Sequence, residues 1–259
     1  LTEGLKEAAA APGSLPPAQL AHTKRRLFVL GHLWKGGAKE LLDRERGRDL
    51  LDPCLRVAVD LYQSGPRQTK AESVRALGMI LAGKPEAALR PEVKAALASA
   101  LSGELDSSPG GASNARLVAL RALIDLARNE ERATVQQQKS SGGKRVSAGV
   151  PIDATCSKGE VSVAGRVVQH FWDTSILPLA AHFTAGEPGP SYDARLRHVL
   201  LDLFGVVLRQ GLVAPWTTVP SLVSLCVDSD QEVQDRARQC LKEHILDKRI
   251  DFFESKVAD

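Results

Sequence analysis

Aromatic residues are scarce in this 259-residue chain, in which three Trp, two Tyr and six Phe together make up 4%. Aromatic and β-branched residues favour strands, whereas Leu and Ala favour helices. The chain contains 35 Leu and 33 Ala, which together are about a quarter of its residues. This composition excludes an all-β fold. Charged residues make up 25%, an ordinary fraction that argues against disorder of the whole chain.

Cysteine is also rare, and the four cysteines stand far apart, at positions 54, 156, 226 and 240. None of them forms a C-x-x-C pair, so neither a zinc framework nor a disulfide-rich fold is indicated. Isolated thiols in a helical chain are typical of a reducing compartment. Cys226 and Cys240 occupy apolar helical positions, and we expect both to be small core residues.

A large net charge and a long apolar run are missing as well. The chain has 34 basic and 31 acidic residues, a net charge of +3, far below that of a protein that coats nucleic acid. A local basic patch remains open. No apolar stretch approaches the ~18–20 residues that cross a membrane, so no membrane partner is expected. The chain begins with Leu1 and shows no secretory signal, so we interpret it as a piece of a longer protein.

Motifs that carry chemistry are absent. There is no P-loop, no dinucleotide-binding glycine motif, no H-E-x-x-H and no G-x-S-x-G. The six histidines are scattered, and no two of them pair at helical spacing near a carboxylate. We therefore expect no catalytic residue, no metal and no cofactor, and a chain that is not an enzyme.

Helical periodicity dominates what the sequence does contain. In one series of segments, apolar residues recur at i, i+3, i+4 and i+7. This series comprises residues 27–34, 72–81, 115–127, 195–209 and 232–245. A second helical series alternates with the first, at residues 50–62, 91–101, 167–183 and 219–227. Glycine and proline separate many of these segments, which predicts antiparallel helix pairs joined by short turns.

Equivalent positions of the first series recur at a regular interval. These positions are Leu30, Leu77, Leu123, Leu200 and Cys240, spaced by 47, 46, 77 and 40 residues. HEAT and armadillo-type repeats have a period of ~40–47 residues. The long interval contains residues 132–166, which are rich in Gln, Ser and Gly, and removing these 35 residues leaves an interval of 42. We therefore predict an all-α HEAT-repeat α-solenoid with a disordered insertion. An irregular helical bundle is the alternative.

The predicted organisation has four parts: a linker or partial helix at 1–21, HEAT repeats at 22–131, the low-complexity disordered insertion at 132–166, and C-terminal HEAT repeats at 167–259. Within the last part, proline at a first helical turn predicts a break near residues 211–215 and a helix that starts close to Thr217. We expect Trp216 to be buried over that junction.

Arginines recur near the starts of the first-series helices, at positions 75, 121, 197 and 236. They form either an internal Arg–Asp ladder or a ridge for phosphate or an acidic partner. For a ridge that faces DNA or a protein partner, the candidates are Arg195, Arg197, Arg236 and Arg238. Residues two apart on a helix point in different directions, so only some of these can reach one ligand. The others would pair with Asp193, Asp202 or Asp235.

One stretch of sequence is more specific. QGLVAPWTTVPSLVSLCVDSDQEV, at residues 210–233, resembles the C-terminal HEAT repeats of the cohesin loader, the Nipped-B or adherin family. The similarity rests on a "GLV-x-P" turn, a "VP-x-L" element, an acidic turn and a "VR-x-x-A" element. Their residues are Gly211, Leu212, Val213, Pro215, Val219, Pro220, Leu222, Asp228, Asp230, Val233 and Ala237.

Two further segments extend this resemblance. Arg26–Gly31 resembles the family's "RALF-x-x-G" helix, and Asp251–Val257 its closing segment, so that the similarity covers about residues 22–257. Gln234 stands where the family usually has a basic residue.

The resemblance implies a non-enzymatic scaffold that acts in sister chromatid cohesion during the cell cycle, bound to chromatin in the nucleus. It implies partners: DNA, and the cohesin subunits, including the SMC heads and the kleisin. The family helps to load cohesin rings onto chromatin and stimulates their ATPase. It also has a smaller loader subunit, which would bind a region outside this chain.

Two other interpretations remain at this point. The chain could be another HEAT or armadillo scaffold, such as a transport receptor or a phosphatase scaffold. It could also be a helical enzyme with an unrecognised site, for which a deep pocket with clustered titratable residues would speak.

Overall fold

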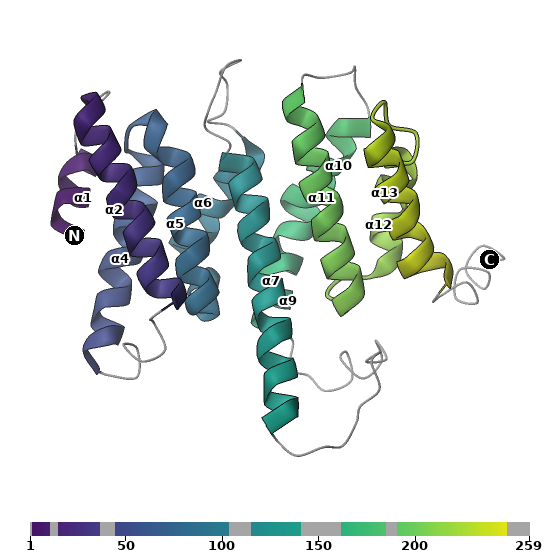
Figure 1. Cartoon of the computed structure of the whole chain (residues 1–259), viewed down its shortest axis with the longest axis horizontal. Helices are drawn as coiled ribbons and strands as arrows, with labels where there is room; N and C mark the ends of the chain where they lie inside the picture. Colours follow the sequence, from purple (N-terminus) through teal and green to yellow (C-terminus); the bar gives the residue numbers. More distant parts are fainter. Residues whose placement is uncertain are drawn as a thin grey trace. The chain divides into compact units, whose positions relative to one another are not determined.

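The computed structural model describes residues 2–10, 15–36, 45–103, 115–140, 162–184 and 191–247. Every regular element in these ranges is a helix, which confirms the all-α prediction (Figure 1). None of the described helices combines the length and the apolar content needed to cross a bilayer. The chain divides into two compact units, Leu1–Leu126 and Ala127–Asp259, which are described separately.

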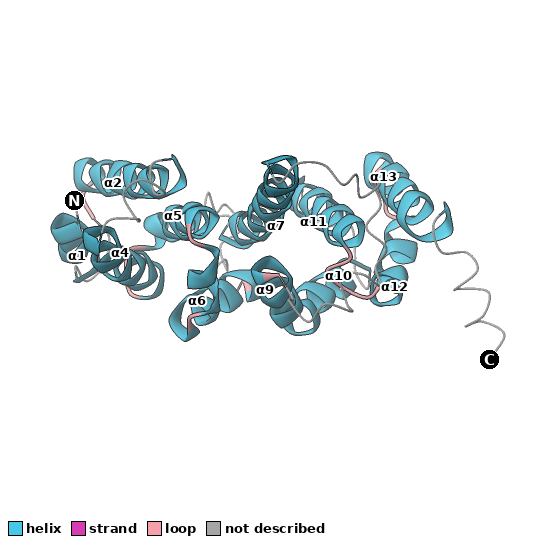
Figure 2. Ribbon diagram, turned by 90° about the horizontal axis from the view of Figure 1, so that it is seen from below, coloured by secondary structure: helices cyan, strands magenta, loops and turns pink. Residues whose placement is uncertain are grey.

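The first unit arranges its helices in two layers. Its helices are α1 (Thr2–Ala10), α2 (Pro17–Gly36), α4 (Glu45–Gln63), α5 (Lys70–Gly83), α6 (Pro91–Ser102) and the beginning of α7 (Ala115–Ser140). Figure 2 shows α2 and α5 in one layer and α1, α4 and α6 in the other. Successive helices run in opposite directions, as the predicted repeats require (Figure 1). Across the layers α1 packs against α2 and α4 against α5, and within one layer α2 packs against α5.

The repeat positions deduced from the sequence form the core of this unit. Leu30, Leu77 and Leu123 are all at most 2% exposed. The helices approach closely because small residues lie between them: a Cβ added to Gly78 would lie 2.6 Å from the Ala122 Cβ. Proline at the first position of α6 and a left-handed Gly103 after its end set its limits.

The second unit repeats the two-layer arrangement. Its helices are the remainder of α7, then α9 (Val163–Phe171), α10 (Leu177–Thr184), α11 (Ser191–Gln210), α12 (Pro215–Leu225) and α13 (Gln231–Leu241). A π-helical turn, Trp172–Ile176, joins α9 to α10, and another, Lys242–Leu246, follows α13. In Figure 2, α11 and α13 lie in one layer and α9, α10 and α12 in the other. Leu200 and Cys240, the repeat positions in this unit, are buried.

The break predicted near residues 211–215 is present. Gly211 adopts a left-handed φ of 67°, which favours glycine. The Leu212 N–H donates to the Val207 carbonyl at 3.0 Å and the Gly211 N–H to the Leu208 carbonyl at 3.3 Å, the Schellman pattern that ends α11. However, α12 begins at Pro215 rather than near Thr217, so Pro220 lies inside the helix.

The predicted insertion is wrong at both of its ends. Residues 132–140 continue α7, and residues 163–166 form the first turn of α9. Glu130 explains part of this order, because its carboxylate accepts hydrogen bonds from the backbone N–H groups of Val163 at 3.2 Å and Ala164 at 2.6 Å. A carboxylate at a helix N-terminus satisfies unpaired donors and the helix dipole. Residues 141–161 lie outside the described residues.

The predicted linker at 1–21 also contains more helix than expected. Residues 2–10 form α1, and α2 begins at Pro17, before the predicted start at residue 22. The closing segment of the family resemblance, Asp251–Val257, lies outside the described residues.

Candidate interaction site

The first of the four candidate arginines, Arg197, is an internal residue. Its side chain on α11 is 10% exposed, and its Nε lies 2.9 Å from Oδ2 of Asp228, whose side chain is 7% exposed. The other carboxylate oxygen of Asp228 accepts the backbone N–H of Asp230 at 2.9 Å. This buried ion pair connects α11 to the turn before α13. The prediction that Arg197 belongs to an exposed ridge is therefore wrong, because burial holds its charge inside the unit.

Arg236 joins α13 directly to α11. From α13, its guanidinium forms an ion pair with Asp202 of α11, and its Nη1 lies 3.1 Å from Nδ1 of His198. Both partners are on α11, and the ion-paired side chains remain more than a third exposed. The predicted pairing with Asp202 is confirmed. Arg197 and Arg236 thus form the internal Arg–Asp ladder in this unit.

The predicted ladder of arginines at positions 75, 121, 197 and 236 does not extend into the first unit. Arg75 pairs within its own helix, with Glu72 at 2.7 Å. Arg121 is exposed, and among the described residues it has no hydrogen bond or ion pair. Two of the four arginines therefore connect neighbouring helices.

Arg238 and Arg195 are the exposed members of the candidate set. Arg238 donates from Nη2 to the Gln234 side chain at 2.9 Å and to the Cys226 carbonyl at 3.2 Å, near the end of α12. It also lies 3.5 Å from Asp235, as predicted, with more than half of its side chain exposed. Arg195 is exposed and has no polar partner in the part of the chain that the structure describes. Asp193, a predicted partner, has a side chain that the structure does not describe.

The expectation for Trp216 is wrong. Its side chain, on the second residue of α12, is 54% exposed. The buried indole near this junction belongs to Trp172, which is 3% exposed and donates from Nε1 to the Thr217 hydroxyl at 3.0 Å. The Trp172 ring also packs against Phe204, with ring centroids 5.5 Å apart.

Exposed apolar side chains follow one face of α12 and continue into the turn after it. The exposed members of this α12 face are Trp216, Pro220, Val223 and Val227. Their spacing of i, i+4, i+7 and i+11 places them on one side of a helix. No charged residue occurs from position 215 to 227. Contiguous exposed apolar patches are a recurring feature of protein–protein contact surfaces. Its periodicity is present in the sequence, where the same spacing is equally typical of a stripe that faces the core.

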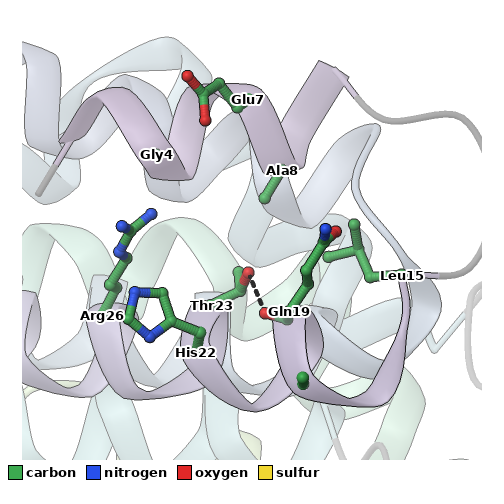
Figure 3. A pocket seen from close by; sticks show the side chains of 9 residues that line it. Gly4, Glu7, Ala8, Leu15, Gln19, His22, Thr23 and Arg26 are labelled. Carbon is green, nitrogen blue, oxygen red and sulfur yellow. Dashed lines mark hydrogen bonds between the residues drawn. The ribbon is translucent and has the colours of Figure 1, made fainter.

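The groove between α1 and α2 in the first unit has a volume of about 460 Å³. Figure 3 shows Arg26 and His22 on α2, with Arg26 directed toward the helix that carries Gly4 and Glu7. A Cβ on Gly4 would lie 1.6 Å from a guanidinium nitrogen of Arg26, so a larger residue at position 4 would require the flexible end of the Arg26 side chain to move. The Thr23 hydroxyl is used within the helix, where it donates to the Gln19 carbonyl at 2.9 Å. The described lining thus shows no hydrogen-bonded nucleophile and base.

The cysteines of the described ranges are protonated at neutral pH. Burial raises the pKa of the Cys240 thiol to about 11, and the Glu243 carboxylate adds to the increase. Burial also raises the pKa of Cys54 and Cys226. Since the thiolate is the reactive form, these residues are poor nucleophiles. Cys240 is a core residue as predicted, whereas Cys226 is half-buried, and Cys156 lies outside the described residues. In the described part of the chain, no group of three or more His, Cys, Asp or Glu residues could hold a metal.

Comparison with protein families decides the assignment of the C-terminal helices. Residues 189–259 match the family model of the Nipped-B C-terminal region, described as sister chromatid cohesion C-terminus. This segment belongs to the Nipped-B family. The match includes the Arg197–Asp228 pair, the candidate arginines and the α12 face, and confirms the resemblance drawn from residues 210–233. Nipped-B membership implies a role in sister chromatid cohesion. No curated protein matches the chain.

Proposed function

We propose that this chain is a non-enzymatic scaffold of the cohesin-loading machinery. In this proposal it engages cohesin and DNA in the nucleus, promotes loading of the ring onto chromatin and stimulates the cohesin ATPase. The observation that carries the proposal is the match of residues 189–259 to the sister chromatid cohesion C-terminus. Its partners would be the SMC heads and the kleisin, and its smaller loader subunit would bind outside this chain.

The α12 face supports a contact with a cohesin subunit. It lies inside the family-matched segment, it is apolar, and an exposed Trp stands at its beginning. Trp is enriched among the residues that contribute most to protein–protein affinity. Nearby polar side chains such as Thr217 and Ser224 provide a neutral border, so the affinity of this contact should depend little on salt.

Pull-down of purified cohesin subunits by the immobilised full chain tests the scaffold assignment. We expect retention of the SMC head–kleisin complex and an increase in its ATP hydrolysis when the chain and DNA are added. Loss of retention with the double variant Trp216→Ser and Val223→Ser would assign the contact to the α12 face. If the chain retains no cohesin subunit, the proposal fails, and another class of HEAT scaffold becomes the better interpretation.

DNA binding should depend on the two exposed arginines. Arg197 is buried, and Arg236 is about one-third exposed in its pair with Asp202. Arg195 is exposed, and more than half of the Arg238 side chain is exposed despite its pair with Asp235, so these last two are the candidates to neutralise phosphates. Two phosphate contacts contribute about −1.8 to the slope of log affinity against log salt concentration. The double variant Arg195→Glu and Arg238→Glu should remove that contribution, measured by fluorescence anisotropy on duplex DNA. Arg121→Glu, an exposed reversal in the first unit, is the matched control. An unchanged slope in the double variant would exclude these two arginines from the DNA contact.

A further inference from the structure

The outer face of α2 is apolar although the part of the chain that the structure describes does not cover it. Leu27, Leu30 and Trp34 of this helix are buried in the first unit. The opposite side carries Phe28 and Leu33, each more than half exposed, and Val29, which is 44% exposed. A helix that buries one side normally presents polar residues on the other. The two turns from Phe28 to Leu33 are therefore apolar on both sides.

The charges around this outer face all have one sign. No Asp or Glu occurs between Pro17 and Gly36, whereas Lys24, Arg25, Arg26 and Lys35 do. A rotation of 100° per residue places Arg25 between Phe28 and Val29 on the helix surface. The His32 ring lies beside Phe28, with centroids 4.2 Å apart, and extends the face toward the end of the helix.

The described surroundings leave these cations largely uncompensated. Asp125 approaches Lys35, but the distance is 3.9 Å and both side chains are about half exposed. An exposed pair of this kind contributes little. Arg25 is exposed, Lys24 is half-buried, and neither has an ion pair among the described residues. An apolar face with a positively charged border thus remains available to a ligand.

We propose that this α2 face binds an amphipathic helix of another protein, one whose apolar residues are flanked by Asp and Glu. The apolar residues of the partner would cover Phe28, Val29 and Leu33, and its carboxylates would lie near Lys24, Arg25 and Lys35. Opposite charges at the border of an apolar contact steer the encounter and fix the register. This inference is independent of the proposed function, because α2 lies outside the family-matched residues 189–259.

Other occupants fit this face less well. Phosphates of duplex DNA would contact the basic residues but gain nothing from Val29 and Leu33, because backbone recognition is electrostatic. A second copy of the chain would bring the same cations together, and like charges at an interface oppose association. Binding to a membrane surface scales with the apolar area that enters the lipid, and this face offers only the side chains of Phe28, Val29 and Leu33.

Binding of stapled helical peptides to the full chain tests the inference. The probe is a fluorescein-labelled peptide of Leu, Ala and Glu with its leucines one turn apart, and the comparison peptide carries Lys in place of every Glu. Fluorescence anisotropy at low salt should show that the acidic peptide binds at least about tenfold more tightly. The difference should shrink at high salt, where the Debye length falls to about 3 Å.

Two double variants of surface residues, of which only Lys24 is half-buried, separate the apolar and the charged contributions. Phe28→Ser with Leu33→Ser, and Lys24→Glu with Arg25→Glu, should each weaken binding of the acidic peptide about tenfold or more. Leu50→Ser, which removes an equally exposed apolar side chain from α4, should leave it unchanged. Equal affinity for the two peptides, or no loss in either double variant, overturns the proposal. Binding of this face to phosphatidylserine vesicles or duplex DNA in place of the acidic peptide overturns it as well. Cohesin retention by these variants remains a separate readout of the proposed function.

Discussion

Replacing Arg197 by alanine should lower the free energy of unfolding of the second unit by about 3–5 kcal/mol, because removing one member of a buried ion pair leaves the other charge uncompensated. The pair is buried on both sides, with side chains 10% and 7% exposed. The carboxylate of Asp228 also holds the turn before α13 through the Asp230 N–H. An isolated Asp228 would therefore disturb the turn that precedes α13. Chemical denaturation, with hydrogen exchange of the α11 and α13 amides, measures the loss.

Two controls separate the buried charge from a general loss of packing. Arg195→Ala removes an exposed arginine two residues earlier and should change stability by no more than about 0.5 kcal/mol. The double variant Arg197→Met and Asp228→Leu should recover part of the loss, since apolar replacement of both ion-pair partners is often close to neutral, but the Asp230 N–H loses its acceptor. A loss below about 1 kcal/mol for Arg197→Ala would contradict burial of the pair, because exposed ion pairs have effects of that size.

Replacing Trp172 by alanine should cost about 3–5 kcal/mol, the usual range for a buried Trp. The side chain is 3% exposed, packs against Phe204 and donates to the Thr217 hydroxyl. Its loss would leave a cavity between the π-helical turn, α11 and α12. Trp172→Phe retains most of the apolar contact and removes the hydrogen bond, so it should cost about 1–2 kcal/mol. Thermal and chemical unfolding of the full chain measure both losses.

Trp216 is the matched control for this prediction. Its side chain is more than half exposed on the same unit, so Trp216→Ala should cost at most about 1 kcal/mol. Equal losses for Trp172→Ala and Trp216→Ala would show that the two indoles are not distinguished by burial. Burial of Trp172 would then not explain the stability of this junction.

Helical periodicity predicted much of the fold. The spacing of Leu30, Leu77 and Leu200 identified buried positions, because a residue on the inner face of each repeat must recur with the repeat. The start of α12 was placed about two residues late. A proline at the first helical position and one inside the helix look alike in sequence, and a helix that starts near Thr217 would have Pro220 in its first turn. With the start at Pro215, Trp216 lies one turn before Pro220 on the outer face.

The ends of the predicted insertion show a limit of composition. Few apolar residues follow Ala127, so the segment lacked a reason to fold by burial alone. Arg, Gln, Glu and Ala are nevertheless good helix formers, and α7 continues through them. The bonds from Glu130 to the start of α9 join residues 33 and 34 positions apart in the sequence. A local pattern cannot predict a partner at that separation.

In the candidate site, too, some features follow from the local sequence and others depend on partners that are distant in the sequence. The sequence predicted that the four arginines could not all face one ligand, since neighbours two apart diverge. It did not identify which would be buried, because Asp228 is 31 residues after Arg197 and belongs to another element. Only packing of α11 against α13 brings the two together. Arg195 and Arg238 remain exposed. The α12 face depends on the start of α12 at Pro215, which brings Trp216 into the helix.

The central claim, that the Nipped-B segment acts as a cohesin-binding scaffold through α12, is tested most directly by an equilibrium titration. Purified SMC head–kleisin complex is titrated against the full chain, the double variant Trp216→Ser and Val223→Ser, and the control Leu50→Ser. We predict saturable binding that the double variant weakens by about tenfold or more and the control leaves unchanged. Absence of binding by the unaltered chain, or equal affinity for the double variant and the unaltered chain, would contradict the account.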